Sequence, residues 1–240
     1  MKRKAKHIMN KLSPRLKKLY DIIPVCNCFA DIGTDHAYLP VYLCKNNKCK
    51  TAIASDIVKG PLDRAKTNIK KHNLNDRISV RLGGGVSTLN ENEADTVLIA
   101  GMGGLIIADI LRDGYEVLKS VKTIILQPMT AITDLREFLY LNNWSIDKEY
   151  LVKDNGKLYS ILSVSLSDKK LEYTDKYIYI GKYLIENKPE HFNEYLDRKI
   201  IKLKKKLEGL SLSTTDTSKE SIKQAKERLD AVLKIREEIK

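Results

Sequence analysis

Acidic and small residues follow the first apolar segment of this 240-residue sequence, in the stretch FADIGTDHAYLP at residues 29–40. Asp31 stands where a strand-like run ends, Gly33 permits a tight turn, and a helix-like run starts at His36. This order is typical of the first unit of a nucleotide-binding sheet. Only Gly33 matches the G-x-G-x-x-G pattern, which argues against a pyrophosphate at the helix start. A cationic ligand without phosphate, such as S-adenosylmethionine, suits the carboxylates of Asp31 and Asp35.

A third carboxylate, Asp56, comes 25 residues after Asp31, at the end of the next strand-like run. A carboxylate in this place can accept both hydroxyl protons of a cofactor ribose. The alternative is that Asp56 only caps the following helix. We expect Asp56 and the adjacent Ile57 to contact the cofactor.

Small residues follow the third and fourth strand-like runs. The glycines after the third run let the backbone approach a flat ring such as adenine, or they form a flexible turn. The residues after the fourth run replace the Asn/Asp-Pro-Pro-aromatic clamp of many amino-methyltransferases and leave room for a base, or they form a tight turn. Gln127, at the end of the fifth run, can hydrogen-bond a base edge or satisfy local backbone. The candidates in the first two loops are Gly83, Gly84, Gly85, Ala100, Gly101 and Met102.

Strand-like and helix-like runs alternate between residues 25 and 141, which favours a parallel sheet covered on both faces. The expected strands are 25–32, 51–56, 77–82, 95–100 and 121–127, and the expected helices are 36–46, 60–72, 103–119 and 131–141.

The alternation stops after residue 141. Residues 144–152 and 158–166 form two strand-like runs, and Asn155-Gly156 between them is a strong hairpin signal. An open sheet that ends in an antiparallel hairpin is the usual layout of S-adenosylmethionine-dependent methyltransferases. We therefore expect an α/β, class I (Rossmann-like) fold with a seven-stranded sheet.

Helical patterns dominate after residue 167. Residues 174–188, 190–209 and 219–240 have helical spacing, and residues 211–218 form a polar loop. The last two helices resemble an antiparallel pair or coiled coil. We expect a methyltransferase domain at 1–167 and a helical coiled-coil domain at 168–240.

The net charge of +12 is unevenly distributed along the chain. Residues 1–20 have eight Lys/Arg and no acid, residues 21–167 have 17 of each sign, and residues 168–240 have 18 against 14. Basic flanks around a neutral middle favour a polyanion held from outside the catalytic centre, although simple solubility gives the same pattern. In the N-terminal flank, Ser13 and Pro14 suit the start of a helix. The candidate contacts to RNA are Arg15, Lys17, Lys18, Lys202, Lys204, Lys205 and Lys206.

The remaining features indicate a cytoplasmic protein. The basic start lacks the apolar segment of a signal peptide, and no apolar run approaches a membrane span. The four cysteines, Cys26, Cys28, Cys44 and Cys49, are expected to be reduced thiols rather than a zinc site, so we expect no metal. The oligomeric state stays open, with a monomer favoured.

Several stretches together resemble the bacterial tRNA adenine N1-methyltransferases that modify position 22. These are SPRL, FADIGTDHAYLP, ASDIVKGPLDRAKTNI, IAGMGG and LQP, which extend over residues 12–166. The resemblance implies a class I methyltransferase domain plus a coiled coil, S-adenosylmethionine as cofactor and tRNA as partner. Two positions depart from the family pattern: Gly84 replaces an acid, and Met129 replaces an asparagine.

Adenine N1 has its own lone pair, so the reaction needs orientation and proximity more than a strong base. We expect His36 and Tyr38 to shape or stack the base pocket, Arg15 to contact RNA, and Gln127 to contribute at the base edge. For His36 and Tyr38, a structural helix start and core packing are the alternatives. Other possible functions are methylation of another RNA site or a small molecule, and non-catalytic RNA binding on a methyltransferase fold.

Overall fold

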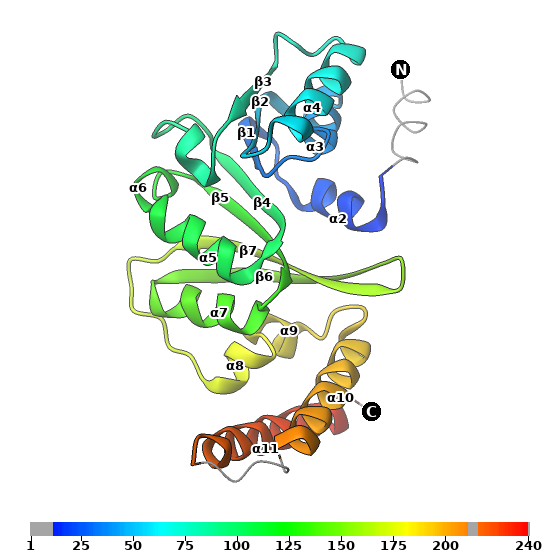
Figure 1. Cartoon of the computed structure of the whole chain (residues 1–240), viewed down its shortest axis with the longest axis vertical. Coiled ribbons are helices and arrows are strands. Elements are labelled where there is room, and N and C mark those ends of the chain that lie inside the picture. The colour runs from blue at the N-terminus through cyan, green and yellow to red at the C-terminus, as the bar shows by residue number, and fades with distance from the viewer. Residues whose placement is uncertain (1–11, 211–215, 240) are drawn as a thin grey trace.

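A seven-stranded sheet runs through the molecule in the order β3-β2-β1-β4-β5-β7-β6 (Figure 1). The computed structural model describes residues 12–210 and 216–239. Strands β1 to β5 are parallel, and β7 runs antiparallel to both β5 and β6. This confirms the expected sheet and its terminal hairpin. The strands are β1 (Cys26–Ile32), β2 (Cys49–Asp56), β3 (Ile78–Leu82), β4 (Thr96–Gly103), β5 (Thr123–Thr130), β6 (Trp144–Asp154) and β7 (Lys157–Leu166).

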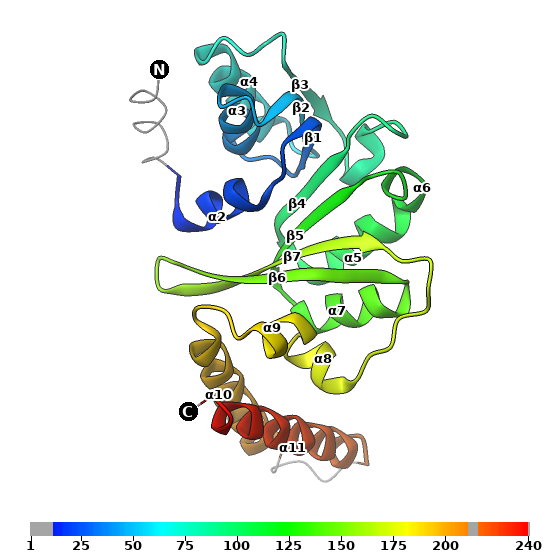
Figure 2. The same ribbon diagram turned by 180° about the vertical axis from the view of Figure 1, so that it is seen from behind.

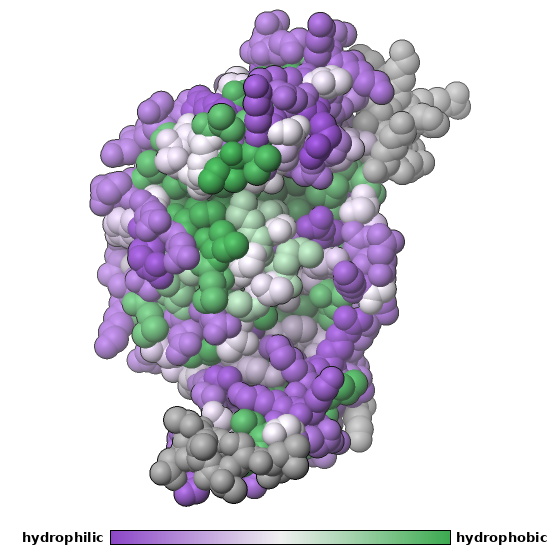
Figure 3. All heavy atoms as spheres, in the orientation of Figure 1, coloured by the Kyte–Doolittle hydropathy of each residue, from purple (hydrophilic) through white to green (hydrophobic). Residues whose placement is uncertain are grey.

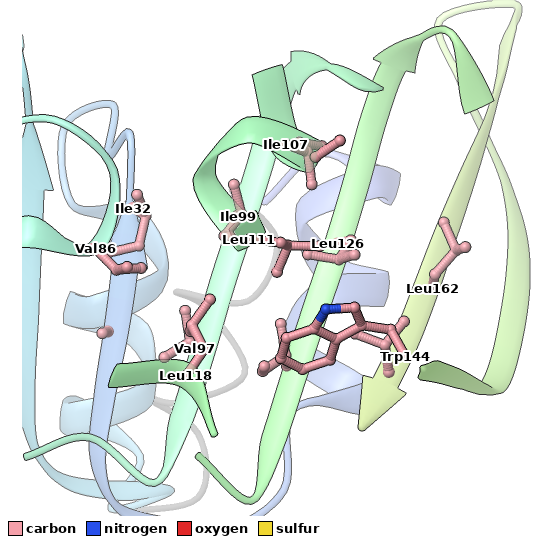
Figure 4. Close-up of a cluster of buried hydrophobic side chains, with 14 of the residues drawn as sticks. Ile32, Val86, Val97, Ile99, Ile107, Leu111, Leu118, Leu126, Trp144 and Leu162 are labelled. Carbon is pink, nitrogen blue, oxygen red and sulfur yellow. The ribbon is translucent and has the colours of Figure 1, made fainter. Parts of the chain in front are cut away.

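Helices cover both faces of the sheet, because alternate residues of the central strands point to opposite sides. On β4, Val97 and Ile99 join one buried cluster and Leu98 joins another. The first cluster, part of which is drawn in Figure 4, lies under α5 (Gly104–Asp113), α6 (Tyr115–Leu118) and α7 (Ile132–Leu141). The second lies under α2 (Pro14–Ile22), α3 (Tyr38–Lys45) and α4 (Lys59–Lys71). A short 3₁₀ helix, η1 (Gly85–Thr88), follows β3.

Helix α2 begins as the sequence predicts. The Ser13 hydroxyl accepts a hydrogen bond from the Leu16 backbone N–H at 3.4 Å, and Pro14 occupies the first helical position. Leu19 is buried in the second cluster and fixes the helix on the sheet layer. The first half of the basic 1–20 segment lies outside the described residues.

Two of the expected helices are each divided in two. The 103–119 helix breaks at Gly114, where a Cβ atom would lie 2.0 Å from the Val86 side chain. The 174–188 helix is instead α8 (Asp175–Tyr179) and α9 (Lys182–Asn187). Between them Gly181 has φ +110°, and a Cβ there would lie 2.2 Å from Glu149 Oε2. Close tertiary contacts, which helical periodicity does not reveal, therefore decide both breaks.

The β6–β7 hairpin turns at Asn155 and Gly156, with φ of 47° and 74°. Positive φ at both residues is what a type I′ turn requires, so the Asn-Gly prediction is confirmed. The hairpin extends beyond the rest of the sheet, between α2 and the C-terminal helices (Figure 2). It thereby brings residues 154–159 near the start of α2.

The C-terminal helices form a third buried cluster. Helices α10 (Phe192–Leu210) and α11 (Asp216–Glu237) pack through residues that include Leu196, Leu203 and Val232. This cluster also contains Leu151 of β6, and α8 and α9 pack on α7 and β6. The α8–α9 segment thus joins the helical pair to the sheet.

Candidate active site

The carboxyl ends of β1 and β4 border a cavity of about 320 Å³. In parallel α/β sheets, ligands bind at this edge. Seven of the residues that the sequence predicts for the site come together here: Arg15, Asp31, Gly33, Asp35, Tyr38, Ala100 and Gly101. Leu16, Leu19, Leu39 and Leu98 complete the walls and were not among the predicted site residues.

Asp31 is buried at the end of β1, with 8% of its surface exposed. Burial raises the pKa of its carboxyl group to about 6, and the charges of Asp56 and Asp35 act in the same direction. The Thr34 hydroxyl donates a hydrogen bond to Asp31 Oδ2 at 2.7 Å, which acts in the opposite direction. No cationic side chain pairs with Asp31 among residues 12–210 and 216–239. The site is therefore suited to a ligand that brings its own positive charge.

The turn after β1 is held tightly against β2. Gly33 has φ +75°, and the backbone N–H groups of Gly33 and Thr34 both donate to the Ser55 carbonyl, at 2.9 and 2.8 Å. A Cβ at Gly33 would lie 2.2 Å from Met102 Cε, so Met102 packs directly on the turn. The positive φ favours glycine at position 33, and a side chain there would also have to displace the end of Met102.

The chain then passes through two left-handed residues, His36 and Ala37, with φ of 59° and 50°. Positive φ is strained for these residue types and is maintained by the surrounding structure. Asn68 of α4 contributes by donating to the His36 carbonyl at 2.7 Å. The rings of His36 and Tyr38 stack, with centroids 5.2 Å apart and planes at 19°.

Asp56 and the glycine loop meet at the ends of β2 and β3. Asp56 Oδ1 accepts the Val58 backbone N–H at 2.7 Å, which supports the alternative of a local cap for one oxygen. The Gly83 N–H donates to the Asp56 carbonyl at 3.0 Å. A Cβ at Gly84 would lie 3.5 Å from the exposed side chain of Ile57. The ribose and adenine candidates thus lie side by side.

A second cavity of about 330 Å³ continues this edge toward α5. Its lining includes Gly84, Gly85 and Ile106. Ile106, Leu105, Ile57 and Leu82 are all more than half exposed. Figure 3 shows apolar side chains gathered on this face over α5. An exposed apolar surface beside a polar cavity is suited to a flat aromatic ring.

Arg15 is fixed at the mouth of the first cavity by three contacts. Its Nη1 donates to Gln127 Oε1, its backbone N–H donates to Asp154 Oδ2 at 3.4 Å, and its guanidinium lies 5.4 Å from the centre of the Tyr159 ring. Gln127 is fully buried and also donates through Nε2 to the Pro128 carbonyl at 3.0 Å. Gln127 therefore uses its amide nitrogen to bond the local backbone and its amide oxygen to orient Arg15. No sequence pattern predicted Asp154 and Tyr159, which the β6–β7 hairpin places beside Arg15.

The predicted RNA contacts differ in their surroundings. Lys17 pairs with Asp21 at 3.4 Å, and the Lys18 ammonium lies 4.5 Å from the centre of the Tyr150 ring. The lysines of α10 are all exposed, and these are Lys202, Lys204, Lys205 and Lys206. The α10 group is therefore the more accessible of the two.

The four cysteines are free thiols, with Cys44 Sγ and Cys49 Sγ 3.3 Å apart. Within the described ranges, no cluster of His, Cys, Asp or Glu has the geometry of a metal site. No helix in the same ranges has the length and apolar character needed to cross a membrane.

The fold and the site together define a class I S-adenosylmethionine-dependent methyltransferase: a parallel sheet that ends in an antiparallel hairpin, with carboxylates at the ends of β1 and β2. The family model described as TrmK, tRNA (adenine(22)-N(1))-methyltransferase, matches residues 29–235. The chain therefore belongs to the tRNA (adenine(22)-N(1))-methyltransferase family.

Individual relatives agree with this assignment. The chain is 34% identical over 230 residues to the tRNA (adenine(22)-N(1))-methyltransferase of Bacillus subtilis, covering 94% of this chain and 97% of the relative. The crystal structure of the B. subtilis m1A22 tRNA methyltransferase TrmK has a TM-score of 0.85, with 33% identity and coverage of 94% and 99%. A Streptococcus pneumoniae putative tRNA (m1A22) methyltransferase in complex with S-adenosylmethionine has a TM-score of 0.79, with 30% identity and coverage of 94% and 99%.

Proposed function

We propose that this enzyme methylates N1 of adenine 22 in tRNA with S-adenosylmethionine, and that the Asp31 cavity holds the donor. The observation that carries the donor assignment is the Asp31 carboxylate, buried and without a cationic partner in the described chain. The donor has a cationic amino group and a sulfonium, so it supplies the missing charge.

The residues around Asp31 fit the rest of the donor. Asp56 keeps one carboxylate oxygen, Oδ2, without a partner among the described residues, and this oxygen is available to the ribose hydroxyls. The exposed side chain of Ile57 next to Gly84 suits the adenine ring. Because Gly84 replaces the family's acid, we assign recognition of the adenine amino group to backbone carbonyls of the Gly83–Gly85 loop.

The donor supplies an electrophilic methyl group on a positively charged sulfur. Adenine N1 attacks with its own lone pair, so no residue has to remove a proton before the carbon–nitrogen bond forms. The protein's task is to expose the base, hold N1 in line and exclude water. The small residues Ala100 and Gly101 leave space for the base at the donor cavity.

Arg15, Gln127, His36 and Tyr38 are proposed to position the adenine. Gln127 and Tyr159 hold the Arg15 guanidinium at the cavity mouth, where it can contact the base or an adjacent phosphate. Tyr38 lines the same cavity and is 42% exposed, so its ring is available for stacking. Met129 is exposed, and its sulfur lies 3.5 Å from Gln127 Nε2, so an apolar side chain stands beside Gln127 where the family has asparagine.

The helical region is proposed to hold the body of the tRNA. The exposed lysines of α10 face solvent, and double-stranded RNA is held mostly through its backbone and shape. Lys17 and Lys18 border Arg15 and are proposed as weaker contacts. We propose that the boundary between the two domains lies near residue 167. Helices α8 and α9 pack on α7 and β6, so a truncated protein that keeps these two helices should end after Lys188.

Mass mapping of methylated nucleosides tests the function. The protein is incubated with S-adenosylmethionine and unmodified tRNA, and with the same tRNA carrying guanine at position 22. We expect N1-methyladenosine at position 22 of the first tRNA and none in the second. Methylation elsewhere supports another RNA site, and donor binding without methylation supports a non-catalytic protein. We further propose a cytoplasmic monomer, which light scattering of the protein with and without tRNA will test.

A further inference from the structure

A surface groove of about 410 Å³ lies between the turn after β1 and helix α4. It is separate from the donor cavity, but Tyr38 lines both, so one ring forms the wall between them. The groove is lined by His36, Tyr38, Asp63, Arg64, Thr67, Asn68 and Lys71.

One side of the groove is a preformed aromatic stack. The His36 and Tyr38 rings lie nearly parallel with centroids 5.2 Å apart. Asn68 holds the backbone of His36 by its hydrogen bond to the carbonyl, and the left-handed residues 36 and 37 fix the approach to Tyr38. A stack of this kind offers a nucleobase a π-face without further ordering.

The other side is formed by α4, a helix with a net positive charge. Helix α4, KGPLDRAKTNIKK, has five Lys/Arg and one acid. Lys66 pairs with Asp63 and Arg64 with Asp35, at 3.6 and 3.7 Å. Lys71 is exposed on the groove and has no ionic partner in the described ranges. The neutral charge count of residues 21–167 therefore conceals a strongly basic helix beside the donor cavity.

We propose that this groove binds a nucleotide adjacent to the target adenine, with its base on the His36–Tyr38 stack and its phosphate at Lys71. The inference rests on the proposed function and extends it. Adenine N1 lies on the pairing edge, so the base must leave its helix before methylation, and the nucleotides beside it are then unstacked. A second stacking site across the Tyr38 wall holds one of them and keeps the strand open.

Two neighbouring lysines provide a matched test of the phosphate contact. Lys71→Gln changes a residue of the groove, whereas Lys70→Gln makes the same charge change one position away, outside the lining. We expect Lys71→Gln to raise the KM for tRNA by about 3- to 10-fold and to reduce the slope of log affinity against log salt by about 1. Lys70→Gln should stay within about 2-fold of the parent, and Lys71→Arg should restore binding. Equal effects of Lys70→Gln and Lys71→Gln overturn the phosphate contact.

The stacking contact is tested with two tRNAs that lack the base on one or the other side of adenine 22. One of them should bind the parent several-fold more weakly than intact tRNA, and Tyr38→Ala should weaken this tRNA less than it weakens intact tRNA, because part of the two losses is the same contact. Fully additive losses overturn the stacking. Donor affinity and methylation of intact tRNA by the parent are measured alongside. If the parent does not methylate position 22, the proposed function fails; if it does and the lysine variants match, only the groove assignment fails.

Discussion

Two buried carboxylates in this enzyme have opposite surroundings. Glu149 of β6 is fully enclosed and paired with Arg136 of α7, whose Nη2 lies 2.8 Å from Glu149 Oε1. Arg136 also donates to the Tyr195 hydroxyl and to the carbonyls of Ile178 and Tyr179, all at 3.3 Å. Asp31 of β1, by contrast, accepts a hydrogen bond from the Thr34 hydroxyl and lies near the negative charges of Asp56 and Asp35.

This difference distinguishes a carboxylate that stabilises the fold, Glu149, from a carboxylate that is available to a ligand, Asp31. The Arg136–Glu149 pair connects the sheet to the segment that leads into the C-terminal helices. Burial acts against the Arg136 charge, but Glu149 and Tyr195 more than offset it and raise the pKa of Arg136. Within residues 12–210 and 216–239, Asp31 has the Thr34 hydrogen bond but no ion pair with a cationic side chain. An uncompensated buried charge at the edge of a cavity is therefore a strong sign of a ligand of opposite charge.

Breaking the structural pair should have the largest effect on stability. Glu149→Ala leaves the Arg136 guanidinium buried without its anion, so we expect a loss of about 3–5 kcal/mol in the free energy of unfolding. Urea denaturation measures it. As a control, Lys153→Ala breaks an exposed ion pair with Glu194 and should leave the urea midpoint nearly unchanged. Equal midpoints for the two variants would contradict a structural role for the buried pair.

Removing the charge of Asp31 should increase the stability of the ligand-free protein, whereas breaking the Arg136–Glu149 pair should decrease it. Raising the pKa of Asp31 from 3.8 to about 6 destabilises the folded state by about 3 kcal/mol once the group is ionised. The penalty is absent below pH 3.8, grows as pH rises, and is complete above about pH 6. Asp31→Asn should therefore raise stability at pH 7 by up to about 3 kcal/mol, with no gain near pH 3.5. A loss of stability at pH 7 contradicts the account.

Asp56 is an intermediate case, because one of its oxygens already has a backbone partner. Asp56→Ala should weaken S-adenosylmethionine binding by about 10-fold through lost ribose hydrogen bonds, while the fold survives. Calorimetry measures the affinity, and circular dichroism checks the fold. Unchanged affinity removes Asp56 from the cofactor site.

The lysines proposed to contact RNA are ranked by the same criterion, namely whether each one already contacts another side chain among the described residues. Replacing the exposed Lys204, Lys205 and Lys206 by Gln should weaken tRNA binding several-fold and reduce the salt slope by about 2 to 3. Replacing Lys17 and Lys18, which already contact Asp21 and Tyr150, should have a smaller effect. Filter binding at several salt concentrations tests this order, and a reversed order places the tRNA on the N-terminal side.

Local patterns were sufficient to predict much of this molecule. Strand periodicity, the Asn155-Gly156 turn and the Ser13-Pro14 helix start each depend on neighbours in sequence, and all three are confirmed. The two predicted carboxylates at the ends of β1 and β2 lie at the same edge of the sheet for a similar reason, because successive parallel strands end at one edge.

Features made by distant segments could not be predicted in this way. Arg15 contacts Tyr159 only because the hairpin folds past α2. The interruption of the predicted 174–188 helix at Gly181 depends on the close approach of Glu149. The positive charge of α4 is not visible in the net charge of residues 21–167, because acidic residues elsewhere in those 147 residues cancel it. The pairing of Arg136 with Glu149 likewise requires the tertiary fold.

The most direct test of the account is the pH dependence of S-adenosylmethionine affinity in the parent and in Asp31→Asn. Calorimetric titrations between about pH 5 and pH 7 cover the range in which the Asp31 carboxyl ionises. The account predicts that parent affinity falls as pH drops below about 6, while the Asn variant binds weakly and equally at every pH. Parent-like affinity in the Asn variant at pH 7 would show that Asp31 does not hold the donor.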